Sequence, residues 1–106
     1  MILINVKFRP LDEYQDNFME KVADFTTASR AEDGCLFFDW YRSTEDDGLY
    51  ILVEAFQDDA AEAHVTSDHF AAGLEAMRPA LAETPRIISR QVEGTGWDEM
   101  GELKID

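Results

Sequence analysis

The chain has 106 residues and carries 23 acidic against 9 basic side chains, giving a formal net charge of −14 at pH 7. This length suits one compact domain, and 45% apolar residues can fill one modest core. The charge argues against nucleic acid and anionic membrane surfaces as partners, because both attract Lys and Arg. No apolar run approaches the length of a transmembrane helix. We therefore expect a soluble protein that repels polyanions.

The N-terminus and the cysteine count indicate a cytoplasmic protein. The first ten residues, MILINVKFRP, are apolar but lack the charged region and cleavage site of a signal peptide. Cys35 is the only cysteine, so it cannot form an internal disulfide, which fits a reducing compartment.

Strand-like and helix-like patterns alternate along the chain. Between Leu11 and Arg30 the apolar residues recur three and four positions apart, which predicts an amphipathic helix with Gly34 as its C-cap. The second and third predicted strands are close enough to form a hairpin. The predicted strands, rich in β-branched and aromatic residues, cover residues 2–8, 35–43, 49–57 and 85–93.

The second helical region is predicted to be broken in two. Asp59 with Glu62 resembles a capping box for a short helix over residues 59–65. Thr66 and Ser67 then interrupt that helix and cap a longer one from about Asp68. Pro79 lies inside the second pattern and is expected to kink it.

The resulting order, β-α-β-β-α-β, predicts a ferredoxin-like α+β fold, an antiparallel sheet with helices on one face. We assign residues 1–93 to this domain and residues 94–106 to a C-terminal tail.

The two middle strands carry apolar residues on both faces, which predicts a homodimer. In strand 49–57, for example, Ile51 and Val53 alternate with Leu52 and Phe56. Helices can cover only one face, so the other needs a partner or leaves a large apolar patch exposed. We expect two sheets packed face to face; the alternative is a monomer whose tail folds over the open face. Trp97 of the tail could reach either surface.

His64 and His69, the only histidines, are the main candidates for chemistry. On one continuous helix, five residues place two side chains about 140° apart, so a shared metal ion is not expected. A histidine is suited to remove a proton from a phenol or enol near neutral pH. The alternative is structural: His64 bonds Glu54 or the backbone and fixes the helix break.

Other polar and aromatic residues have two interpretations each. Glu54 lies mid-strand on a covered face and needs a partner, either an arginine (Arg42, Arg90) or a histidine. Aromatic side chains of the two middle strands either line a flat pocket or belong to the core; they are Trp40, Tyr50 and Phe56. Asn5 either donates to a substrate oxygen or lies at an edge or interface. Cys35 is expected to pack rather than react.

Two stretches resemble a known family. EDGCLFFDWYRS is similar to a Glu-x-Gly-Cys segment that leads into an aromatic strand, and YILVEAFQDDAAEAHVTSDHF to a strand ending in Glu-x-aromatic followed by Ala-x-x-x-His and His-Phe. Both resemble the antibiotic biosynthesis monooxygenase family over roughly residues 2–93. The resemblance implies a dimeric α/β-barrel. It also implies one of three activities: cofactor-independent oxygenation of quinols or anthrone-like polyketides, haem degradation, or isomerisation of the autoinducer-2 signal.

This sequence departs from the family pattern at two places, which reduces the number of expected activities. The family often has Trp where this chain has Phe56, and the long second helix presents Phe70, Leu74 and Met77 inward, with no haem-ligating histidine. Haem degradation is therefore not expected. The phrase EAF before an acidic turn is closer to the autoinducer-processing branch.

Our first hypothesis is a cofactor-free, metal-free monooxygenase that uses O2 and an enolisable aromatic substrate. His64 or His69 removes a proton, and Asn5 or Tyr50 stabilises the oxyanion; the resemblance also places an Asn near this position in some members. The expected substrate-binding residues are Trp40, Glu54, Phe56, Phe70 and Met77. The second hypothesis, an isomerase of a phosphorylated signal, needs a cationic clamp from Arg42, Arg86 or Arg90. The third is a non-catalytic dimeric ligand-binding domain.

Overall fold

Four antiparallel strands form one sheet in the order β2-β3-β1-β4 in the computed structural model, which describes all 106 residues. Each strand begins and ends within two residues of its predicted bounds. The strands are β1 (Ile2–Phe8), β2 (Cys35–Arg42), β3 (Tyr50–Phe56) and β4 (Arg86–Gln91). The βαββαβ order and the central position of β1 and β3 confirm the ferredoxin-like α+β prediction.

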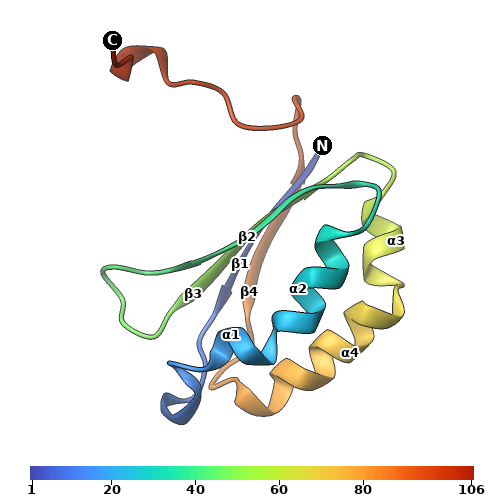
Figure 1. Cartoon of the computed structure of the whole chain (residues 1–106), viewed down its shortest axis with the longest axis vertical. Helices are drawn as coiled ribbons and strands as arrows, with labels where there is room; N and C mark the ends of the chain where they lie inside the picture. Colours follow the sequence, from blue (N-terminus) through green and yellow to red (C-terminus); the bar gives the residue numbers. More distant parts are fainter.

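The helices all cover one face of the sheet (Figure 1). They are α1 (Phe18–Lys21), α2 (Ala23–Arg30), α3 (Ala61–Val65) and α4 (Asp68–Met77), with 3-10 turns η1 (Asp12–Tyr14) and η2 (Arg78–Ala80). A third 3-10 turn, η3 (Gly101–Leu103), lies in the segment after β4, away from the sheet. None of them is long and apolar enough to cross a membrane.

The core lies between this helical layer and the covered face of the sheet. Alternate residues of the strands point into it, as the pattern predicted, because successive side chains in a strand face opposite ways. The buried cluster is Ile4, Val6, Phe8, Phe18, Val22, Phe25, Phe38, Tyr50, Leu52, Phe56 and Met77.

Two local predictions about the first helical region were wrong. The continuous helix over 11–30 is three pieces, because the backbone at Asn17 and Val22 leaves helical geometry. Gly34 is not a C-cap, since α2 ends at Arg30 with Ala31 after it. Gly34 instead permits a close approach: an added Cβ would lie 2.1 Å from the Cβ of Ala60.

The second helical region is broken where predicted, although one of its caps differs. The residue before α3 is Ala60, with no capping side chain, so the Asp59 capping box is absent. Ser67 is the N-cap of α4, and its hydroxyl accepts the Phe70 N–H at 3.1 Å. After Met77 the α-helix gives way to the 3-10 turn η2, which contains Pro79. The helix is therefore disturbed at the proline, as predicted.

The other face of the sheet has no helical cover. A β-bulge at Leu36 places Cys35 on the helix side, because the register shifts between Cys35 and Phe37. The exposed apolar side chains of this face and its rim include Tyr41, Ile88 and Val92. The chain after β4 runs away from the sheet as an extended segment (Figure 1). Its Trp97 ring lies 5.8 Å from that of Phe37 and is 74% exposed.

Candidate functional site

A cavity of about 230 Å³ lies between the sheet and helices α2, α3 and α4. Its walls are almost entirely apolar, and the only ionisable side chains among them are Glu54 and His64. The lining residues are Ile4, Val6, Phe8, Phe25, Leu52, Glu54, His64, Val65, Phe70, Leu74, Met77, Pro85 and Ile87. A larger hollow of about 710 Å³ beside the N-terminus is a wide, open depression, so it offers little enclosure for chemistry.

Glu54 is a buried carboxyl group without an arginine partner. It points from the middle of β3 to the helix side and is 5% exposed. Arg42 instead pairs with Asp16 at 3.1 Å and Asp47 at 3.5 Å, and Arg90 is exposed on β4. Burial, with a smaller contribution from the charge of Glu32, raises the pKa of Glu54 to about 8. The carboxyl is therefore mainly protonated at neutral pH.

His64 faces Glu54 from α3. Its Nε2 lies 3.6 Å from Oε1 of Glu54, too far for a direct hydrogen bond. The imidazole is 3% exposed, stacks on Phe56 with ring centres 4.5 Å apart, and meets Phe70 edge-on at 5.2 Å. This aromatic surrounding fixes the plane of the ring.

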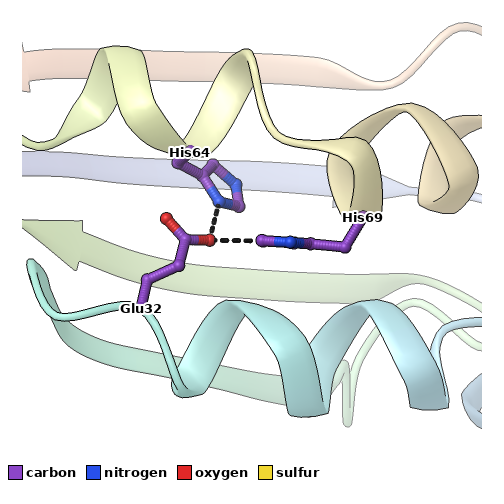
Figure 2. A group of neighbouring side chains, drawn as sticks. All are labelled: Glu32, His64 and His69. Carbon is purple, nitrogen blue, oxygen red and sulfur yellow. Dashed lines mark hydrogen bonds and ion pairs between the residues drawn. The ribbon is translucent and has the colours of Figure 1, made fainter.

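Glu32, in the loop after α2, holds the other side of the His64 ring. Its Oε2 lies 2.6 Å from Nδ1 of His64 and 2.7 Å from Nε2 of His69 (Figure 2). A carboxylate oxygen only accepts, so both histidines donate to it. A neutral imidazole that donates from Nδ1 keeps Nε2 as an acceptor, and in His64 that atom faces Glu54.

The helix break is what brings both histidines to one carboxylate. Ser67 takes an extended conformation, with φ −73° and ψ 154°, so the helical rotation between His64 and His69 is interrupted. The break is fixed locally, because the Ser67 hydroxyl donates to the His64 carbonyl at 2.6 Å and the Thr66 hydroxyl to the Glu62 carbonyl at 2.8 Å. The large angle expected on a continuous helix therefore does not apply.

Glu32, His64 and His69 are also residue types that bind zinc or iron, and their ligand atoms lie within 4.8 Å of one another. Their arrangement is nevertheless that of hydrogen bonds. Both nitrogens lie 2.6–2.7 Å from one oxygen, whereas the ligand atoms of a tetrahedral zinc are about 3.3 Å apart. We therefore describe these three residues as a hydrogen-bonded triad.

The structure brings together only some of the residues proposed from the sequence. Phe70 and Met77 line the cavity with Glu54 and His64, and Phe56 supports the His64 ring from behind. His69 lies outside the cavity wall, on Glu32.

Three proposed residues lie elsewhere. Asn5 is on the opposite face of the sheet from the cavity, beside Lys7 and Ile88. The Tyr50 hydroxyl donates to the Gln15 carbonyl, and the Trp40 indole N–H donates to Thr26 at 2.8 Å.

Cys35 packs on the core, where burial and the charge of Glu32 raise the pKa of its thiol to about 11. A thiol with so high a pKa is a poor nucleophile. The sequence interpretation missed Glu32, although it lies in the EDGC stretch that carries the family resemblance.

A model of one protein family, described as antibiotic biosynthesis monooxygenase, matches residues 1–76. The chain belongs to the antibiotic biosynthesis monooxygenase family. The match includes Glu32, Glu54 and both histidines, whereas Met77, Pro85 and Ile87 of the cavity wall lie beyond it. No curated protein matches the chain in sequence.

Solved structures of similar fold include other proteins whose names assign them to the antibiotic biosynthesis monooxygenase family. One from Caulobacter crescentus CB15 is 27% identical, with a TM-score of 0.79 over 87% of this chain and 90% of the other. One from Nitrosomonas europaea is 22% identical, with a TM-score of 0.78 over 87% and 98%. One from Deinococcus radiodurans is 17% identical, with a TM-score of 0.81 over 95% and 100%. The similarity to the Nitrosomonas and Deinococcus proteins is one of fold alone.

Proposed function

We propose that the protein is a monooxygenase that acts with O2 on a quinol or similar enolisable aromatic molecule and uses no cofactor. The observation that carries this proposal is the cavity, whose apolar walls are interrupted only by Glu54 and His64. Apolar walls suit a flat aromatic ring, and about 230 Å³ limits it to a small ring system.

A substrate hydroxyl between Glu54 and His64 would satisfy both groups. The gap of 3.6 Å is too long for a direct bond, and an oxygen beside it, on the cavity side, can lie within hydrogen-bond distance of both atoms. That oxygen would accept a hydrogen bond from protonated Glu54 and donate its own proton to Nε2 of His64. Only an O–H group does both, as phenols and enols do.

Transfer of the proton to His64 starts the chemistry. The resulting anion is electron-rich and reduces O2, forming a carbon–oxygen bond. The O–O bond then breaks: one oxygen stays on the substrate, which loses two hydrogens, and the other leaves as water with both of them, one being returned by His64. The protein supplies the base, the hydrogen bond to the oxyanion and an apolar cavity for the ring.

The isomerase alternative lacks support from the cavity. A phosphorylated ligand needs cationic groups, and no Arg or Lys lines the cavity. Arg42 is held by two aspartates, and Arg86 lies on the far side of Ile87 in an exposed groove with Arg9, Asp46 and Glu83.

We further propose that the protein works as a homodimer. The uncovered sheet face and the apolar side chains after β4 support this proposal. The most exposed of the latter are Trp97 at 74%, Met100 at 61%, Leu103 at 66% and Ile105 at 86%. Patches of this kind mark protein interfaces.

Oxygen consumption tests the proposed reaction. Protein treated with a chelator and freed of small molecules would be mixed with a panel of hydroquinones and naphthohydroquinones in an oxygen electrode. We expect uptake above the uncatalysed rate, reduced roughly 100-fold or more in His64→Gln. Glu20→Gln, an exposed change on α1, should leave the rate unchanged. Uptake that is equal in wild type and His64→Gln would contradict the assignment of His64 as the base.

A further inference from the structure

One carboxylate oxygen of Glu32 receives the N–H groups of two histidines that come from different helices (Figure 2). The exposed fraction of the side chains rises along this triad, from 3% at His64 through 15% at Glu32 to 27% at His69. The triad therefore connects the buried cavity wall to the surface, and only its first member touches the cavity.

We propose that Glu32 is the positioning residue of His64 and that His69 in turn positions Glu32. Glu32 holds the proton of His64 on Nδ1, so that Nε2 is free and directed at the cavity. The role in catalysis rests on the proposed function, but the positioning itself belongs to the free protein.

Glu32 is the neighbour of His64 that can select its tautomer. Apart from Glu32 and Glu54, its ring neighbours are His69 and the phenylalanines Phe25, Phe38, Phe56 and Phe70. Phenylalanine rings set the plane of an imidazole but cannot select between its two tautomers. The short contact to a charged acceptor can, because hydrogen bonds to charged groups are the stronger ones.

The other choice of tautomer would disable the base. If Nε2 carried the proton, His64 would present a donor to the cavity, where Glu54 is already a protonated donor. A substrate hydroxyl could then be held but not deprotonated. The position of one proton on His64 therefore decides whether the cavity can act on an O–H group.

His69 gives Glu32 a second donor and keeps its carboxylate oriented. It begins α4 just after the Ser67 cap, so its place follows from the same helix break that places His64. A carboxylate with two N–H donors on one oxygen is less free to rotate than one with a single donor. The break in the helix therefore determines the positions of both histidines of the triad.

The tautomer can be measured without any substrate. Long-range proton–nitrogen correlation spectra of histidine-labelled protein at neutral pH distinguish a protonated from an unprotonated ring nitrogen. We expect His64 to carry its proton on Nδ1 in the wild type. Glu32→Ala should shift His64 towards a mixture with the Nε2–H form, and Glu20→Ala should change nothing.

Further variants keep the test decisive if Glu32→Ala does not fold. Glu32→Gln retains one acceptor oxygen without charge and should shift the tautomer ratio partially. His69→Gln should leave Nδ1 protonated but broaden or split the His64 signals as Glu32 gains mobility. An Nε2–H form in the wild type, or an unchanged tautomer in both Glu32 variants, would overturn the proposal. Stoichiometric Zn²⁺ binding through both histidine nitrogens would overturn it too, because the triad would then be a metal site.

Activity separates this inference from the proposed function. In hydroquinone-dependent oxygen uptake, Glu32→Ala should lower kcat roughly 100-fold with little change in KM, since substrate binding does not involve Glu32. The expected tautomer in a protein that consumes no oxygen would contradict the oxygenase proposal and leave the positioning standing. Oxygen uptake with unchanged kcat in Glu32→Ala would contradict the positioning role alone.

Discussion

Glu54 and His64 face each other across 3.6 Å, between Oε1 and Nε2, at the only polar point of an apolar cavity. Neither has another protein partner on that side. Glu54 comes from the middle of β3 and His64 from the end of α3, so the pair depends on the packing of the helical layer on the sheet.

Glu54 should make the protein less stable as the pH rises. Its pKa is raised from the ordinary 4.5 to about 8, so the folded state holds a proton that the unfolded state has released over this range. The loss of folding stability from ionising Glu54 is absent below about pH 4.5, grows between about pH 4.5 and pH 8, and is complete above about pH 8. The shift in the pKa corresponds to a decrease of roughly 3–5 kcal/mol in the free energy of unfolding.

Glu54→Gln removes this titration and isolates the effect. Urea unfolding at pH 5, 7 and 9 should show the variant gaining free energy of unfolding over the wild type as the pH rises. Glu20→Gln serves as the exposed control. A difference between Glu54→Gln and wild type that stays constant with pH would show that Glu54 does not titrate abnormally.

The Ser67 cap should contribute to both stability and the site. Ser67→Ala removes the hydroxyl that accepts the Phe70 N–H and donates to the His64 carbonyl, and should cost about 1 kcal/mol. Thr44→Ala, in the exposed β2–β3 loop, should cost little. Thermal unfolding measures the first effect. The histidine spectra should also show His69 disturbed in Ser67→Ala, and an unaltered His69 would mean that the cap does not place it.

The strand pattern and the helix break could be predicted from the sequence, because alternation and capping are local properties. Alternation placed Ile51 and Leu52 on opposite faces, and Ser67 is the cap that its residue type suggested. Local signals were less reliable where tertiary contacts decide. Gly34 resembles a C-cap in sequence, but its role is a close approach to Ala60, which is distant along the chain.

The candidate site could be predicted only in part from the sequence, for the same reason. Glu54 and His64 could be proposed from their residue types, but their meeting depends on how α3 packs over β3. Glu32 was missed because an acid before a glycine has no local signature of a histidine partner 32 positions away. Asn5 was proposed as a site residue, yet strand alternation alone puts it on the face opposite Ile4 and Val6.

Gly73 should tolerate no side chain, although it lies in a helix. An added Cβ would lie 2.7 Å from the ring of Phe25, a wall of the cavity. Gly73→Ala gains about 1 kcal/mol of helix propensity but costs roughly 1–3 kcal/mol by overpacking. We expect net destabilisation and a smaller cavity, measured by urea unfolding and by binding of a naphthalene-sized probe.

The matched control for Gly73 is Gly96→Ala, where an added Cβ meets nothing within 4 Å. That variant should unfold like the wild type. If Gly73→Ala were more stable than the wild type, α4 would have to pack less tightly on α2 than the contact with Phe25 indicates.

The open sheet face should hold the dimer together. Ile88 is 59% exposed there, and a glutamate at this position would place a charge in the proposed interface. We expect Ile88→Glu to convert the dimer to a monomer at micromolar concentration in light scattering, with the fold retained. Removing residues 95–106 should weaken the dimer as well, because it deletes Trp97 and the exposed apolar residues after it.

Met19→Glu is the control for this surface. Met19 is 39% exposed on the helical layer, so the same change in charge there should leave the oligomeric state unaltered. Wild-type protein that is monomeric at micromolar concentration would contradict the proposed dimer. A dimer that survives Ile88→Glu but dissociates in Met19→Glu would mean that the helices, and not the sheet, form the interface.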